Sequence, residues 1–71
     1  MDTPQMFLVV NIGCIDCGVS SDIVGVFETE AQANQIASDC WKKYRWREGG
    51  ENAFEVFPLP EVGVINPNYE L

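Results

Sequence analysis

Apolar positions along the chain fall into three short runs and one stretch with helical periodicity. Residues 6–12 form a nearly continuous apolar run rich in β-branched side chains, which is typical of a central strand buried on both faces. Residues 23–27 and 53–57 predict two further strands. Gly25 suits a bulge or a close backbone approach in the first of these, and Pro58 ends the second because proline cannot donate to a sheet.

A helix is predicted between the second and third strands. Thr29 and Gln32 have the spacing of a capping box, in which two side chains satisfy free backbone amides at a helix start. Apolar residues then recur with the spacing of one helical face, at Ala33, Ile36, Ala37, Cys40, Trp41 and Tyr44. Acidic residues precede this stretch and basic residues follow it, as the helix dipole favours. The pattern therefore predicts a helix over 29–44.

The element order β-β-α-β predicts an α+β fold in a single domain over 1–71, with a core over 6–57 and a C-terminal tail over 58–71. A hairpin joins the first two strands, and a right-handed crossover through the helix places the third strand beside the first. The expected sheet is three-stranded, mainly antiparallel and of order 2-1-3, with the helix on one face. The other face, carrying Phe7 and Val9 or their alternates, needs the tail or a second molecule to cover it, so a homodimer is expected.

Charge narrows the choice of partner. The 71 residues carry a net charge of −7, which disfavours direct binding to nucleic acid or an anionic membrane and suits a basic surface on another protein. The alternative is that the charge serves solubility alone. A hydrophobic share of 46% excludes intrinsic disorder, although so short a chain is near the lower limit for a self-sufficient core.

The expected location is the cytoplasm. The first residues include the acidic Asp2 where a signal peptide would be positive, and the longest apolar run, 6–10, is too short to span a bilayer. Three cysteines, an odd number, agree with a reducing compartment.

The chain lacks the residues that most often perform catalysis. It contains no histidine, which removes the commonest general base and the commonest metal ligand. No serine lies in a nucleophile-elbow pattern, and the glycines have no phosphate-binding spacing. We therefore expect no enzymatic activity and no cofactor.

The segment Cys14-Ile15-Asp16-Cys17 is the one motif with chemical interest, and it lies in residues 13–22, whose small polar composition predicts a loop. A structural zinc needs four ligands, and only Cys40 and Asp16 remain to complete such a set. A redox pair is favoured where the first cysteine begins a helix, whereas this motif follows a strand. A structural or incidental role is the leading interpretation, with metal and redox roles as alternatives.

All four positive charges fall within residues 41–47, where they alternate with aromatic residues. Such a segment can bind single-stranded nucleic acid. The competing interpretation places Trp41 and Tyr44 in the core, on the apolar helix face, with the cations complementing the helix C-terminus. Trp46 falls opposite that face, so it is folded back in a loop or exposed, and an exposed tryptophan beside arginines is typical of a binding hot spot.

The stretch from Ile23 to Ala33, together with Phe54-Glu55-Val56, resembles a strand-to-helix junction and last strand of small β-β-α-β domains encoded by bacteria and phages. The resemblance covers residues 6–57 and implies the fold above without implying an activity. In size and charge the chain is also similar to phage anti-defence proteins, including anti-CRISPR proteins, several of which occupy basic nucleic-acid-binding surfaces.

These features favour a small acidic, non-catalytic binding protein, encoded by a phage or mobile element, that inhibits a host nucleic-acid-binding or defence protein by occupying its basic surface. The alternatives are a homodimeric accessory or regulatory domain, and a small metal or thiol protein based on Cys14 and Cys17. The predicted partner-binding residues are Asp16, Asp22, Trp46, Arg47, Glu48, Glu51 and Glu61.

Overall fold

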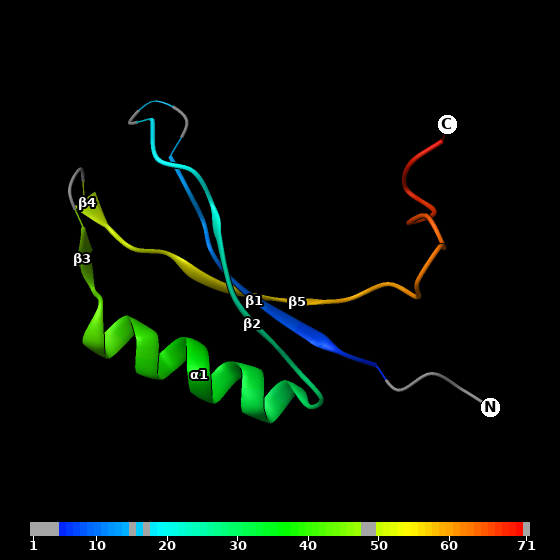
Figure 1. Cartoon of the computed structure of the whole chain (residues 1–71), viewed down its shortest axis with the longest axis horizontal. Coiled ribbons are helices and arrows are strands. Elements are labelled where there is room, and N and C mark those ends of the chain that lie inside the picture. The colour runs from blue at the N-terminus through cyan, green and yellow to red at the C-terminus, as the bar shows by residue number, and fades with distance from the viewer. Residues whose placement is uncertain (1–4, 15, 17, 48–49, 71) are drawn as a thin grey trace.

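Three strands form the main sheet in a computed structural model of the chain, which describes residues 5–14, 16, 18–47 and 50–70. Strand β1 (Phe7–Asn11) is central, with β2 (Asp22–Phe27) on one side and β5 (Phe54–Pro58) on the other (Figure 1). Both pairings are antiparallel. The predicted strand order is therefore confirmed, and the run that is apolar on both faces does form the centre of the sheet.

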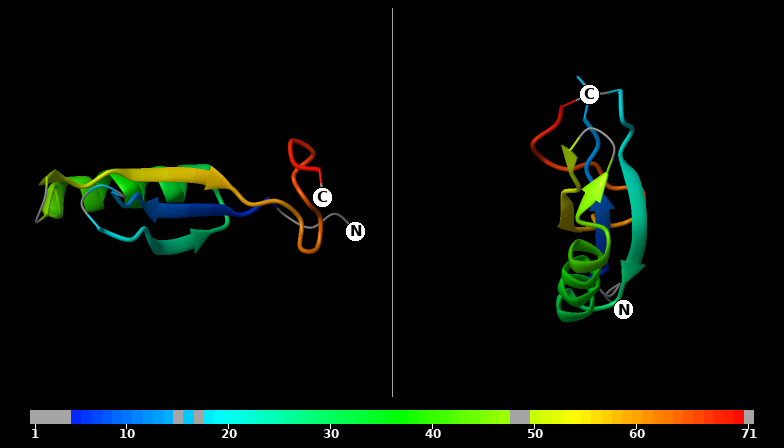
Figure 2. Two further views of the ribbon diagram at one scale, coloured as in Figure 1. Left: turned by 90° about the horizontal axis from the view of Figure 1, so that it is seen from above. Right: turned by 90° about the vertical axis from the view of Figure 1, so that its left-hand side faces the viewer.

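Helix α1 (Glu30–Lys43) covers one face of this sheet (Figure 2). Thr29 is its N-cap, and the Thr29 hydroxyl accepts a hydrogen bond of 3.1 Å from the Gln32 backbone N–H. Tyr44 is the C-cap, and its backbone N–H donates to the Cys40 carbonyl. The helix predicted over 29–44 is thus confirmed, with its two end residues acting as caps.

Side chains along each strand point alternately to the two faces of the sheet. One face is covered by α1, and we call the other the open face. Val9 points towards α1 and is fully buried, as is Ala33 on the helix. Gly25 pairs with Val9, and a Cβ at Gly25 would lie 3.0 Å from the Phe27 ring, so glycine leaves room for that ring. The register of β2 shifts directly after this pair, which confirms the bulge that Gly25 predicts.

The buried core is small. Among the described residues, Val9 and Ala33 are the buried hydrophobic ones. The Cα radius of gyration is 14.1 Å, whereas a compact domain of this length has a value of about 11 Å. The single helix and single sheet therefore leave much apolar side-chain surface in contact with solvent.

A short second hairpin follows α1 and was not predicted. It pairs β3 (Trp46–Arg47) with β4 (Gly50–Glu51), so that Trp46 lies opposite Glu51. Strands of two residues are too short to produce an alternating pattern in the sequence. The hairpin places Trp46 in a strand at the end of the molecule.

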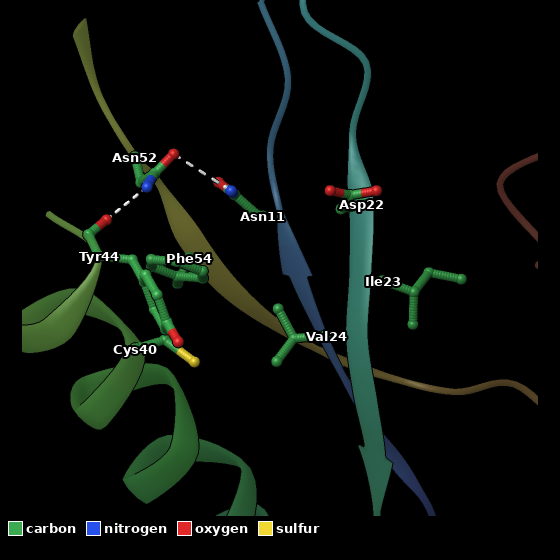
Figure 3. A pocket seen from close by; sticks show the side chains of 8 residues that line it. All are labelled: Asn11, Asp22, Ile23, Val24, Cys40, Tyr44, Asn52 and Phe54. Carbon is green, nitrogen blue, oxygen red and sulfur yellow. Dashed lines mark hydrogen bonds between the residues drawn. The ribbon is translucent and has the colours of Figure 1, made fainter. Parts of the chain in front are cut away.

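Asn52, directly after β4, is a buried polar residue that joins this hairpin to the helix and the sheet. Its side-chain Nδ2 donates to the Tyr44 carbonyl, and its backbone N–H donates to the Arg45 carbonyl at 2.8 Å. Its Oδ1 accepts a hydrogen bond of 3.2 Å from Nδ2 of Asn11 on β1 (Figure 3). One residue therefore fixes the end of α1 relative to the central strand.

The C-terminal segment, residues 59–70, leaves the end of the sheet. The Leu59 backbone N–H donates to the Met6 carbonyl at 2.9 Å, and the Gln5 side chain donates to the Leu59 carbonyl. Residues 60–70 are all exposed and lie beyond the end of the sheet (Figures 1 and 2). The segment therefore does not cover the sheet face opposite α1, which was one of the two expectations for that face.

Candidate partner-binding site

Three exposed aromatic residues gather where α1 ends and β3 begins. Trp41, Tyr44 and Trp46 are 38%, 53% and 69% exposed. The Arg45 guanidinium carbon lies 4.5 Å from the Trp41 ring centroid and 5.3 Å from the Trp46 ring centroid, so one cation contacts both indoles. Each such contact is worth about 0.5–1 kcal/mol at an exposed position. We refer to Trp41, Tyr44, Arg45 and Trp46 as the aromatic cluster.

The exposure of Trp41 and Tyr44 shows that their assignment to the core is wrong. The earlier positions of the same helical face, Ala33 to Cys40, are buried or half-buried where they face the sheet. Opposite the last turn of α1, however, an open pocket separates the helix from the sheet, and both polar and apolar residues of the sheet line it, among them Asn11, Val24 and Phe54. Because the sheet does not close against this turn, the end of the apolar stripe stays exposed and becomes part of the aromatic cluster.

The hairpin holds this cluster in place with charged contacts. Arg45 Nε lies 3.0 Å from Glu51 Oε1 on β4, in an ion pair whose two side chains are about half exposed. Such a pair contributes only about 0.2–1 kcal/mol, but it fixes the guanidinium between the indoles. Arg47 is half-buried, and its Nη1 donates to the Ile12 carbonyl at 3.1 Å, which ties the hairpin to the end of β1.

Five of the predicted partner-binding residues share one end of the molecule. Arg47 meets the end of β1 through the hydrogen bond to Ile12 just described, and the loop that follows lies at the same end as the hairpin in Figure 1 and in the left view of Figure 2. Asp16 is exposed in the loop, and Asp22 is exposed at the start of β2. The residues at this end are Asp16, Asp22, Trp46, Arg47 and Glu51.

Two predicted residues do not join them. Glu61 belongs to the C-terminal segment, which lies at the opposite end of the molecule (Figure 1). Glu48 lies outside the described residues. The structure adds Trp41, Tyr44 and Arg45, which the sequence signals only as part of the alternation of aromatic and basic residues over 41–47.

An open pocket of about 480 Å³ lies between α1 and β2, next to the aromatic cluster (Figure 3). Tyr44, Asn52 and Asn11 contribute to its wall, together with Asp22 and the free thiol of Cys40. The Asn11 Oδ1 is buried and accepts no hydrogen bond from the described residues. The pocket thus combines polar groups that can orient a partner side chain, without a paired nucleophile and base among its described lining residues.

Cys14, the first residue of the cysteine motif, pairs with Val19 across the loop. Cys14 and Val19 exchange two backbone hydrogen bonds, of 2.8 and 2.9 Å, and Cys14 is disulfide-bonded. Cys17 lies outside the described residues. Within the part of the chain that the structure describes, no three potential ligands lie close enough together to hold a metal ion.

No protein-family model, no curated protein and no solved structure matches this chain. The fold and the cluster define it as a small α+β domain with an exposed aromatic–arginine surface at one end. Helix α1 is not long and apolar enough to cross a membrane. The resemblance to phage and bacterial β-β-α-β domains stays a prediction.

Proposed function

We propose that the chain is a small acidic, non-catalytic binding protein that attaches to a basic surface of a partner protein through the end that carries the aromatic cluster. The observation that carries this proposal is Trp46, which is 69% exposed, contacts the Arg45 guanidinium and lies opposite Glu51 in the hairpin. Tryptophan and arginine are the residues most enriched at the energetic centres of protein interfaces.

The ordering of the cluster favours tight binding. An interface side chain that becomes fixed only on binding costs about 0.5–1.5 kcal/mol of conformational entropy. Arg45 is already held by Glu51 and by both indoles, so much of this cost is met in the free chain. Trp46 would serve as the apolar anchor, buried by the partner.

The net charge of the whole chain, −7, supplies long-range attraction. Asp16, Asp22 and Glu51 are exposed at this end, where they offset the four cations of residues 41–47. Such charge accelerates encounter with a basic surface and loses effect as salt screens it. A chain bound to a basic surface would exclude nucleic acid from that surface. We propose that the chain inhibits a host nucleic-acid-binding or defence protein in this way.

The proposal is tested by affinity capture and titration. Wild-type chain and a Trp46→Ala variant are immobilised, and proteins retained from a bacterial lysate at low salt are identified, purified and titrated. We expect a basic partner whose dissociation constant rises at least tenfold in Trp46→Ala, about 1.4 kcal/mol. We also expect binding to weaken between about 0.05 and 0.5 M salt, as screening shortens the electrostatic range.

Tyr69→Ala is the matched control, because Tyr69 is also a 69% exposed aromatic residue but belongs to the C-terminal segment. It should leave the affinity unchanged. Equal losses in the two variants, or an affinity that does not respond to salt, would contradict the proposal.

A further inference from the structure

The face of the main sheet opposite α1 carries a contiguous set of apolar side chains. Alternation along β1 directs Leu8 and Val10 to this open face, because Val9 between them faces α1. Paired residues share a face, so Val26 and Phe57 flank Leu8, and Ile23 flanks Val10. In the left view of Figure 2 the helix lies behind the sheet, and neither it nor the C-terminal segment covers this face.

Three of these side chains are largely exposed although they are apolar. Ile23, Val26 and Phe57 are 69%, 48% and 45% exposed. The charged residue on the face is Glu55, which lies opposite Val10 on an edge strand and so sits at the rim. An apolar centre with a polar rim is the composition of a protein interface.

The accessible surface of the chain is larger than that of an ordinary monomer. A folded monomer of 7.9 kDa exposes about 4,400 Å², whereas this chain exposes 5837 Å², about 1,400 Å² more. A standard interface removes about 800 Å² from each partner. The surplus of the whole chain exceeds the area that one such interface removes, and the open face contributes to it together with the aromatic cluster and the C-terminal segment.

We infer that the open face binds a second copy of this chain, in a symmetric dimer whose sheets stack face to face. With Val9 and Ala33 as its buried hydrophobic residues in the described part of the chain, the domain needs additional burial whenever it folds. A second copy is the partner that is always present at that moment. Two such faces are self-complementary in their apolar centres, and the Glu55 side chains stay at the solvated rims.

The dimer does not depend on the aromatic cluster, which lies at the end of α1 and on the hairpin. Stacking through the open face leaves both clusters outside the interface. The dimer would therefore present two copies of the proposed partner-binding end. Its formation does not depend on which partner the aromatic cluster binds.

Sedimentation velocity across a concentration series tests the inference. We expect the wild-type chain to approach twice its mass of 7.9 kDa as concentration rises. Val26→Lys places a charge on the open face of both copies and should raise the dimer dissociation constant at least a hundredfold, tenfold for each buried charge. Val62→Lys makes the same substitution in the C-terminal segment, away from the sheet, and should leave the dissociation constant unchanged.

Far-UV circular dichroism of each variant at high concentration checks that it folds. If Val26→Lys does not fold, Ile23→Lys replaces it, because Ile23 is the most exposed side chain on the open face. Trp46→Ala must dimerise like the wild type, which separates this inference from the proposed function. A wild-type chain that stays monomeric up to about 1 mM, or dissociation caused equally by Val62→Lys, would overturn the inference.

Discussion

Replacing Asn52 with aspartate tests whether one buried amide holds the end of α1 against the sheet. The substitution preserves size and the acceptor for the Asn11 amide, but it removes the donor to the Tyr44 carbonyl. In its ionised form the new carboxylate would face that carbonyl, so two acceptors would oppose each other in a buried position. The free energy of unfolding should therefore fall.

The magnitude follows from the groups left without partners. A buried polar group that loses its hydrogen bond costs about 1–3 kcal/mol. For a domain of this size, each kcal/mol lowers the melting temperature by about 4–8 °C, so we expect Asn52→Asp to lower it by roughly 5–20 °C at neutral pH. Asn52→Leu leaves both the Asn11 amide and the Tyr44 carbonyl without their hydrogen-bond partner, so it should lower the stability more than Asn52→Asp does.

The loss of stability of Asn52→Asp relative to wild type should depend on pH in a defined direction. Burial against a carbonyl raises the pKa of the introduced carboxyl above its unfolded value of about 3.9. Its protonated form can donate to the Tyr44 carbonyl, so the deficit relative to wild type is smallest below the unfolded pKa. It grows as the pH rises through the folded-state pKa.

Thermal unfolding followed by far-UV circular dichroism, at about pH 4 and pH 7, measures this difference between Asn52→Asp and wild type. Asn34→Asp adds the same charge at an exposed position of α1 and serves as the control. The reasoning is refuted if Asn52→Asp is as stable as wild type at pH 7, or if its deficit grows on acidification.

Three further substitutions probe other parts of the structure. Gly13→Ala should lower the free energy of unfolding in urea by about 1–3 kcal/mol, because a Cβ there would overlap the loop backbone at Val19 and Ser20. An unchanged urea midpoint would show that the loop rearranges to accommodate the methyl group. Thr29→Ala should cost about 1 kcal/mol by loss of the N-cap bond, and Thr29→Ser should retain most of the stability. Arg45→Ala should shift tryptophan emission to longer wavelength while changing stability by no more than about 1–2 kcal/mol, because its cation–π contacts are exposed; an unchanged spectrum would contradict the stacked geometry.

The sheet could be predicted because its determinants are local. Residues 6–12 are apolar on both faces, which marks a central strand, and the pairing of Thr29 with Gln32 marks the start of the helix. With one hairpin and one crossover helix, few strand orders remain. The observed order β2-β1-β5 is the one that these constraints select.

The binding end could be predicted only in part. Trp46 stood out because it falls outside the helical stripe, but Trp41 and Tyr44 share that stripe and were wrongly placed in the core. Burial of a helical residue depends on what lies opposite it in space. Here the last turn of α1 faces an open pocket whose other walls come from strands distant in sequence, and no helical pattern contains that information.

By itself, the amino-acid sequence determined the helix and the three strands of the main sheet, their order and the acidic charge of this protein, because periodicity, capping and composition act over a few neighbouring residues. Only the tertiary structure decided which apolar side chains remain exposed. It placed Arg45 between two indoles, set a hairpin beside the helix end and left the face with Leu8 and Val10 uncovered. Exposure is a property of surfaces that meet in space, and it is settled when distant segments come together.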